Sequence, residues 1–229
     1  MEKLLSGLMV VFFILLLFPQ KATSQHEIQY KQLIIRGVTL INGNGAPPIG
    51  PVDIVVENNI IKKITVVGYP GVKIDPENRP KLKTSGKELD ATGMFLLPGF
   101  IDMHGHIGGE AQGADWEYVF KLWMAHGITT VREPSGRGLD YALDLKNKSA
   151  KNEIIAPRIL AYAGFGSGSE IEITTEEQAR EWVRENATKG ADGIKFFGAE
   201  PHIMKAALEE NKKLGLRSAM HHAQMSVAR

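Results

Sequence analysis

Residues 98–106 read PGFIDMHGH, and the pattern of the chain changes at this stretch. Its apolar centre predicts a short strand, and the strand leads into His104 and His106. Side chains two residues apart on a strand point to the same face, so both imidazoles can reach one cation. Neutral imidazole is a favoured ligand of zinc and related metals. The alternative is a pair of ordinary surface or core histidines, because a bare His-x-His occurs often by chance.

After this stretch the chain repeats a strand, a loop and a helix about every 30 residues. The predicted strands cover 100–103, 128–131, 158–162, 192–197 and 216–221, and the predicted helices cover 115–126, 139–150, a segment from 175 onward, and 201–214. Such alternation predicts parallel βαβ units. A closed (β/α)₈ barrel needs about 250 residues. We therefore expect residues 98–229 to form an incomplete TIM barrel of five strands, with an unusual open α/β fold as the alternative.

The segment before residue 98 has a different pattern, that of short strands separated by turns. Strands are expected at 32–36, 39–41, 52–56, 60–67, 89–91 and 94–97. Turns are expected at 42–45 and at Asn58-Asn59, and the Pro- and Lys-rich stretch 70–87 predicts a long exposed loop. The fold class is therefore α/β, with part of a small β-sandwich at 25–97 ahead of the barrel strands.

The first 24 residues are predicted to be a cleaved signal peptide. Lys3 gives a short positive region, residues 4–18 carry no charge, and small residues follow at Ala22-Thr23-Ser24. The alternative is a membrane anchor, but a spanning helix needs about 20 apolar residues. We expect the mature chain to be exported, periplasmic or secreted, with no stable membrane anchor.

Composition excludes several classes of function. The 229 residues contain 27 Lys+Arg against 26 Asp+Glu, a net charge of +1, and no cysteine. Nucleic-acid binding usually needs clustered basic residues, so no nucleic-acid partner is expected. Without cysteine the chain has no disulfide scaffold, no thiolate metal site and no cysteine nucleophile. Any metal must be held by histidine, by carboxylates or by a modified side chain.

Lys195 is the second candidate site residue, because it interrupts the apolar strand GIKFF at 193–197. A lysine buried there without a partner would pay heavily for desolvation. It could be an edge lysine whose ammonium reaches solvent. Alternatively, its pKa is lowered and the neutral amine captures CO₂ as a carbamate, an anionic oxygen ligand. Beside a histidine pair, we favour the carbamate.

The third candidate is His221 or His222, at the end of the fifth predicted strand. Adjacent side chains on a strand face opposite ways, so only one of them can point into the barrel. The other is then a packing or loop histidine.

Four stretches resemble the amidohydrolase superfamily, in particular its imidazolonepropionase-like and Xaa-Pro-dipeptidase-like members. They read LINGNG at 40–45, LLPGFIDMHGH at 96–106, GITTVR at 127–132 and GADGIK at 190–195. The likeness runs through essentially all of the expected mature chain, in order. The stretch around the histidine pair is highly specific, and the other three are moderately so.

This resemblance implies a metal-dependent (β/α)₈ barrel with a small β-sandwich. It implies that His104 and His106 bind a first metal and that Lys195 is carboxylated and bridges two metals. A histidine of strand five binds the second metal, and the family's Gly-Leu-x-x-x-x-His spacing, counted from Gly215, selects His221 rather than His222. The implied cofactors are one or two divalent ions, with zinc expected.

The family pattern also includes a histidine on strand six and a proton-shuttling aspartate on strand eight. The given sequence ends before either, so the resemblance implies a truncated form that is inactive alone, with no catalytic residue assigned here. The implied function is metal-dependent hydrolysis of C–N bonds in small amides, cyclic amides or dipeptides. Arg132 could bind a substrate carboxylate or form a structural salt bridge. The alternative function is that of a non-catalytic exported metal- or ligand-binding relative.

Overall fold

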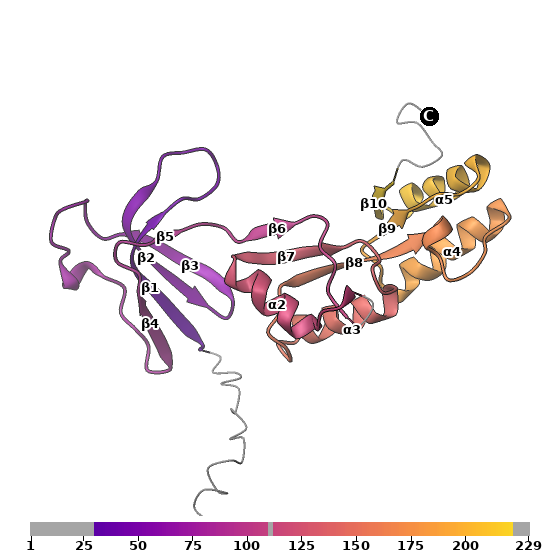
Figure 1. Ribbon diagram of the computed structural model, residues 1–229. Helices are drawn as coiled ribbons and strands as arrows, with labels where there is room; N and C mark the ends of the chain where they lie inside the picture. Colours follow the sequence, from indigo (N-terminus) through magenta and orange to yellow (C-terminus); the bar gives the residue numbers. More distant parts are fainter. Residues whose placement is uncertain (1–29, 110–111, 222–229) are drawn as a thin grey trace, which may run out of the picture. The chain divides into compact units, whose positions relative to one another are not determined.

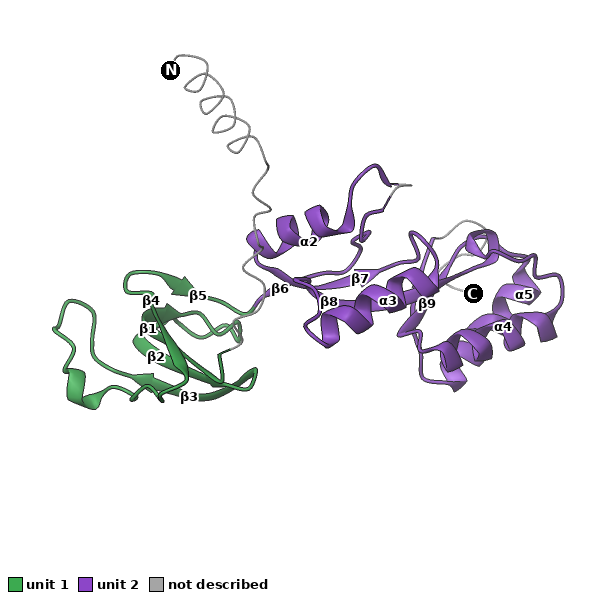
Figure 2. Cartoon of the chain, turned by 90° about the horizontal axis from the view of Figure 1, so that it is seen from below, with its two compact units in different colours: residues 1–98 green, residues 99–229 purple. Residues whose placement is uncertain are grey.

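The computed structural model describes residues 30–109 and 112–221. The chain divides into two compact units, residues 1–98 and 99–229, which are coloured separately in Figure 2. The predicted signal peptide, residues 1–24, lies outside the described residues. Within the described part, no helix combines the length and the apolar character needed to cross a membrane.

Unit 1 is built on one five-stranded sheet with the strand order β3-β2-β1-β4, and the fifth strand, β5, also pairs with β1. The pairs β1–β2 and β2–β3 are antiparallel, whereas β4 and β5 run parallel to β1. The strands are β1 Gln32–Leu40, β2 Ile49–Glu57, β3 Ile60–Val66, β4 Gly86–Asp90 and β5 Phe95–Leu96.

A tight turn joins β2 to β3 at Asn58 and Asn59, whose φ angles are 47° and 66°. A two-residue hairpin loop with positive φ at both positions matches the twist of the flanking strands, and asparagine tolerates this conformation. The predicted Asn-Asn turn is confirmed. The predicted exposed loop at 70–87 is slightly too long, because Gly86 and Lys87 already pair with β1.

Unit 1 buries a charge as well as an apolar core. Val38, Val52 and Ile54 belong to the core, and Asp53, whose side chain points to the other face of β2, is 0% exposed. Arg36 and Arg79 donate hydrogen bonds to its carboxylate at 2.8 and 2.7 Å. Because Arg79 follows the short 3₁₀ turn η1 (Pro76–Asn78), this pairing fixes the long loop against the sheet.

Unit 2 is a mixed α/β structure with a curled, entirely parallel sheet in the order β10-β9-β8-β7-β6 (Figure 1). The order matches the chain order, as expected for successive βαβ units. Its elements are β6 Phe100–Asp102, α2 Trp116–Ala125, β7 Ile128–Glu133, α3 Leu139–Ala150, β8 Arg158–Phe165, the 3₁₀ turn η3 Gly166–Gly168, α4 Glu176–Lys189, β9 Gly193–Phe196, α5 Pro201–Lys213 and β10 Arg217–Met220.

The ends of α4 carry clear capping signals. Thr175 is the N-cap of this helix, and its reciprocal hydrogen bonds with Gln178 make a full capping box. Gly190 ends the same helix in the left-handed conformation, with φ of 106°. The predicted helix at 139–150 has the bounds of α3.

One strand is longer than predicted. The prediction ended at Tyr162, but β8 continues to Phe165 and pairs with β9 through Gly164. In the structure a Cβ at Gly164 would lie only 2.5 Å from the Ser135 hydroxyl, so the residue allows close packing inside a strand.

Candidate metal centre

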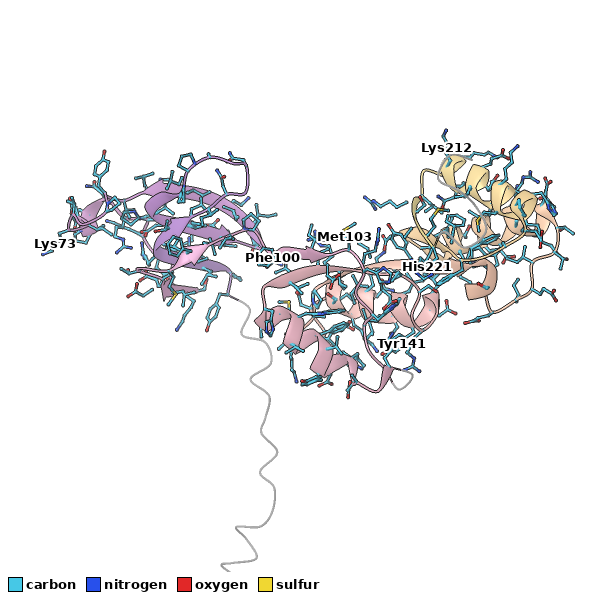
Figure 3. All side chains as sticks on the ribbon, turned by 45° about the horizontal axis from the view of Figure 1, so that its top comes forward. Lys73, Phe100, Met103, Tyr141, Lys212 and His221 are labelled. Carbon is cyan, nitrogen blue, oxygen red and sulfur yellow. The ribbon has the colours of Figure 1, made fainter. Side chains whose placement is uncertain are left out.

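The candidate residues all lie in unit 2, at or beyond the carboxyl ends of its parallel strands. His104 and His106 follow β6, and Arg132 belongs to the end of β7. Lys195 lies in β9. His221, which is labelled in Figure 3, follows β10. Because the strands are parallel, these ends meet at one edge of the sheet, the edge at which barrel active sites form.

Strand pairing places the candidates on one face of the sheet. Lys195 is opposite Gly164 of β8 and Ala219 of β10, so these three share a face. Arg132 is opposite Leu160, which is four residues before Gly164 and therefore on the same face. Residues of the other face, such as Ile194 and Phe196, belong to the core under the helices.

The same alternation favours His221 over His222. The backbone N–H of His221 donates to the carbonyl of Phe196 at 3.0 Å, which extends the β9–β10 pairing past the last assigned residue of β10. Two residues after Ala219, His221 continues the face of Lys195. His222 lies outside the described residues.

Three imidazole rings come together at this edge. The ring centroids of His104 and His106 are 5.4 Å apart and nearly perpendicular. The rings of His104 and His221 are 6.4 Å apart and nearly parallel. The structure thus brings together histidines that are separated by more than a hundred residues of sequence.

Lys195 is the buried amine near this cluster, and only 3% of the residue is exposed. Burial, followed by the nearby Arg132 guanidinium, lowers the pKa of its amine below the ordinary 10.5. Among the described residues, no carboxylate acts on Lys195 to offset this effect. Its Nζ lies 5.7 Å from the centre of the Phe197 ring. A depressed pKa enlarges the neutral fraction of the amine, which is its nucleophilic form.

The pKa of His104 is also lowered, by burial first and then by the positive charges of Lys195, His106, Arg132 and His221. The shift favours the neutral imidazole, which is the form that binds metals. The backbone N–H of His104 donates to Asp102 at 2.9 Å and fixes the turn that leaves β6.

Arg132 lies over the Tyr162 ring, with its guanidinium carbon 5.5 Å from the ring centre. Its Nε is buried and has no hydrogen-bond partner within residues 30–109 and 112–221. None of the ion pairs in this part of the chain includes Arg132. The structural salt bridge, one of the two sequence-based interpretations, therefore has no partner there.

The sequence analysis missed Glu133. This residue ends β7 and is 1% exposed, and its Oε1 lies 3.1 Å from Nδ1 of His106. Its other oxygen accepts a hydrogen bond from the backbone N–H of Ile107 at 2.7 Å. The available signal was an acidic residue directly after an apolar strand, next to the already noted Arg132.

The donor types at this edge suit a divalent metal, but the side chains do not form a closed set of ligands. Among the described residues, no three His, Cys, Asp or Glu side chains are arranged closely enough to hold a metal ion. The three imidazoles and the amine of Lys195 supply nitrogen donors.

A separate cavity of about 220 Å³ lies between α3 and α4. Its lining includes Tyr141, Trp182 and Lys189 but none of the five candidate residues. The histidine cluster is more open, since the side chain of His106 is 43% exposed.

No family model matches the chain. Among curated proteins, it is 32% identical over 101 residues to adenine deaminase 2 of Desulfotalea psychrophila, covering 40% of this chain and 17% of that protein. It is 30% identical over 146 residues to dihydroorotase of Shouchella clausii, covering 59% of this chain and 32% of that protein. The chain is related to the amidohydrolase superfamily.

Solved structures support the fold of this amidohydrolase relative. A Xaa-Pro dipeptidase with bound methionine superposes with a TM-score of 0.58 at 21% identity, over 83% of this chain and 56% of that one. A prolidase bound to N-methylphosphonate-L-proline gives a TM-score of 0.63 at 17% identity, with the same coverage. The chain thus spans about half of these structures and a third or less of the curated relatives.

Proposed function

We propose that this chain carries part of the metal centre of a hydrolase that cleaves C–N bonds in small amides, cyclic amides or dipeptides. The observation that carries the proposal is Lys195, which is buried without an offsetting carboxylate among the described residues and lies near His104. The ring of His104 is close to those of His106 and His221. A buried amine of this kind favours a ligand or a modification that supplies negative charge. The relationship to amidohydrolases supports the same interpretation.

In this proposal His104 and His106 hold a first divalent metal, with zinc expected, and His221 holds a second. The neutral amine of Lys195 would attack the carbon of CO₂, so that a C–N bond forms, one C=O π bond breaks to give an anionic oxygen, and the amine loses one proton to solvent. The product is a carbamate, whose anionic oxygens would be available as ligands to both metals. When bound, a divalent metal supplies Lewis acidity for polarising a carbonyl and activating water.

Arg132 binds the substrate in this proposal. Its guanidinium faces the same side of the sheet as Lys195, and its Nε lacks a partner among the described residues. A substrate carboxylate would satisfy that donor and would neutralise a charge that no described acid offsets. This assignment favours substrates with an anionic group, such as dipeptides, over neutral amides.

The architecture belongs to the same proposal. The five parallel strands correspond to the first five strands of an eight-stranded barrel, and the sheet of unit 1 to part of a β-sandwich. We also propose that residues 1–24 direct export to the periplasm or the medium and are then removed, which the intact mass of the exported protein would test.

The test is a zinc titration in ¹³C-bicarbonate buffer, with ¹³C NMR to detect a carbamate. We expect zinc binding together with a carbamate signal that Lys195→Met abolishes and the exposed control Lys205→Met retains. Unchanged zinc stoichiometry in the double variant His104→Ala/His106→Ala would contradict the metal assignment. Zinc binding without hydrolysis of any amide or dipeptide by the complete protein would favour the non-catalytic alternative.

A further inference from the structure

Glu133 joins the loops that follow two neighbouring strands. Its carboxylate contacts His106 and Ile107 after β6 and Gly136 after β7. The contacted groups are the Nδ1 atom of His106 at 3.1 Å and the backbone N–H groups of Ile107 at 2.7 Å and Gly136 at 2.5 Å. The side chain is 1% exposed, so water cannot substitute for these contacts.

The two backbone N–H groups are obligate donors, and they occupy both carboxylate oxygens. Oε2 accepts from Ile107, whereas Oε1 accepts from Gly136 and also faces His106. An ionised carboxylate offers acceptors only, so it suits three donors. A glutamine amide would present an NH₂ group to at least one of these donors.

We infer that Glu133 is a positioning residue that holds His106 in the Nδ1–H tautomer. In a neutral imidazole one nitrogen carries the proton and the other keeps its lone pair. If Nδ1–H donates to Glu133, the lone pair is on Nε2, the nitrogen on the far side of the ring from the carboxylate. The further consequence, that Nε2 is thereby presented to a metal, rests on the proposed function.

Gly136 makes this arrangement possible. A Cβ at this position would lie 2.7 Å from Nδ1 of His106 and 3.0 Å from Oε1 of Glu133, so any larger residue would intrude between ring and carboxylate. It would also lie 2.7 Å from the side-chain nitrogen of Gln112. Gly136→Ala therefore disturbs the contact between His106 and Glu133 without removing the Glu133 side chain.

The experiment reads the tautomer of His106 directly, by long-range ¹H–¹⁵N NMR of the 229-residue chain without metal. We expect the Nδ1–H form in the unmodified chain and a mixture or the Nε2–H form in Glu133→Gln. The matched control is Glu210→Gln, which alters another buried acid of the same unit, one that pairs with Arg184 instead. If Glu133 had a merely structural role, Glu133→Gln would leave the tautomer of His106 unchanged.

Zinc affinity, measured by competition with a chromophoric chelator, provides the second measurement. We expect Glu133→Gln and Gly136→Ala to weaken zinc binding about 10- to 100-fold, and Glu210→Gln to leave it unchanged. The inference is overturned if His106 of the unmodified chain is in the Nε2–H form, which needs no variant to fold. It is also overturned if Glu133→Gln binds zinc as tightly as Glu210→Gln. If the unmodified chain did not bind zinc, this would contradict the proposed function instead. The tautomer of His106 would still decide the role of Glu133.

Discussion

Unit 1 buries Asp53 between two arginines, whereas unit 2 buries Lys195 beside another arginine. Burial alone would raise the pKa of Asp53, but hydrogen bonds from Arg79, from the backbone of Gly37 and from Arg36 outweigh it and lower the pKa. For Lys195, burial and its charged neighbour act in the same direction, against the charged form.

Asp53 is a structural charge, and in the function proposed above Lys195 is a functional one. The arginines at Asp53 come from a strand and from a distant loop, so their pairing organises unit 1. Within residues 30–109 and 112–221, Lys195 has no counter-charge, and a buried cation in that situation opposes folding. Such a group is expected where a ligand or a modification completes the site, which is the interpretation proposed for unit 2.

The largest expected effect on stability comes from removing the charge of Asp53, which is paired with two arginines. Asp53→Asn keeps the shape of the side chain but leaves Arg79 without its carboxylate and Arg36 with Glu88 alone, so we expect a loss of about 3–5 kcal/mol in the stability of unit 1. Hydrogen exchange at the β1 and β2 amides would measure it, because the three tryptophans all lie in unit 2. Asp90→Asn, an exposed change in the same unit, should cost less than about 0.5 kcal/mol. Equal effects of the two variants would refute the assignment of Asp53.

The corresponding change in unit 2 should have the opposite sign. In metal-free buffer without CO₂, Lys195→Met should leave the stability of unit 2 unchanged or raise it by about 1 kcal/mol, because it removes an uncompensated buried charge. Tryptophan fluorescence during urea unfolding reports on this unit. Lys205→Met, on the exposed surface of α5, is the control. A clear loss of stability in Lys195→Met alone would mean that the ammonium has a structural partner.

The alternation of strand and helix patterns in the sequence predicted most elements of unit 2. It predicted parallel βαβ units, and the bounds of α3 agree with the predicted helix. The end of β8 was missed because Gly164 has the same sequence signature in a loop and in a tightly packed strand. Its role depends on Ser135, which lies on another segment of the chain.

The candidate site was only partly predictable, for a related reason. The candidates His104, His106 and Lys195 carry distinctive chemistry within short stretches of sequence, so they could be singled out without coordinates. Nothing in the local sequence distinguishes Glu133 from other acidic residues. The pairing of β7 with β6 brings it to His106, which is 27 positions away in the sequence. Asp53 likewise meets Arg79 across 26 positions, so neither partner reveals the pair.

The smallest expected effect is a difference in pH dependence between the units. The folded pKa of Asp53 lies below its ordinary 3.8, so its pairing stabilises unit 1 above that pH, and this contribution is lost as the pH falls through the folded value. The folded pKa of Lys195 lies below 10.5, so in the interval up to 10.5 the unfolded chain binds the extra proton and the stability of unit 2 rises with pH.

Each contribution should be smaller than that of the corresponding substitution, because other groups titrate in the same ranges and protonated Asp53 still accepts hydrogen bonds. The measurement is the difference in unfolding free energy between the unmodified chain and each variant, followed from pH 2 to 5 for Asp53→Asn and from pH 8 to 11 for Lys195→Met. For Asp53 the difference should shrink as the pH falls. For Lys195 any advantage of the methionine variant should shrink as the pH rises, because the amine then loses the charge that burial disfavours. If both of these free-energy differences instead shrank as the pH falls, both charges would be compensated in the same way. The contrast between Asp53 and Lys195 would then be lost.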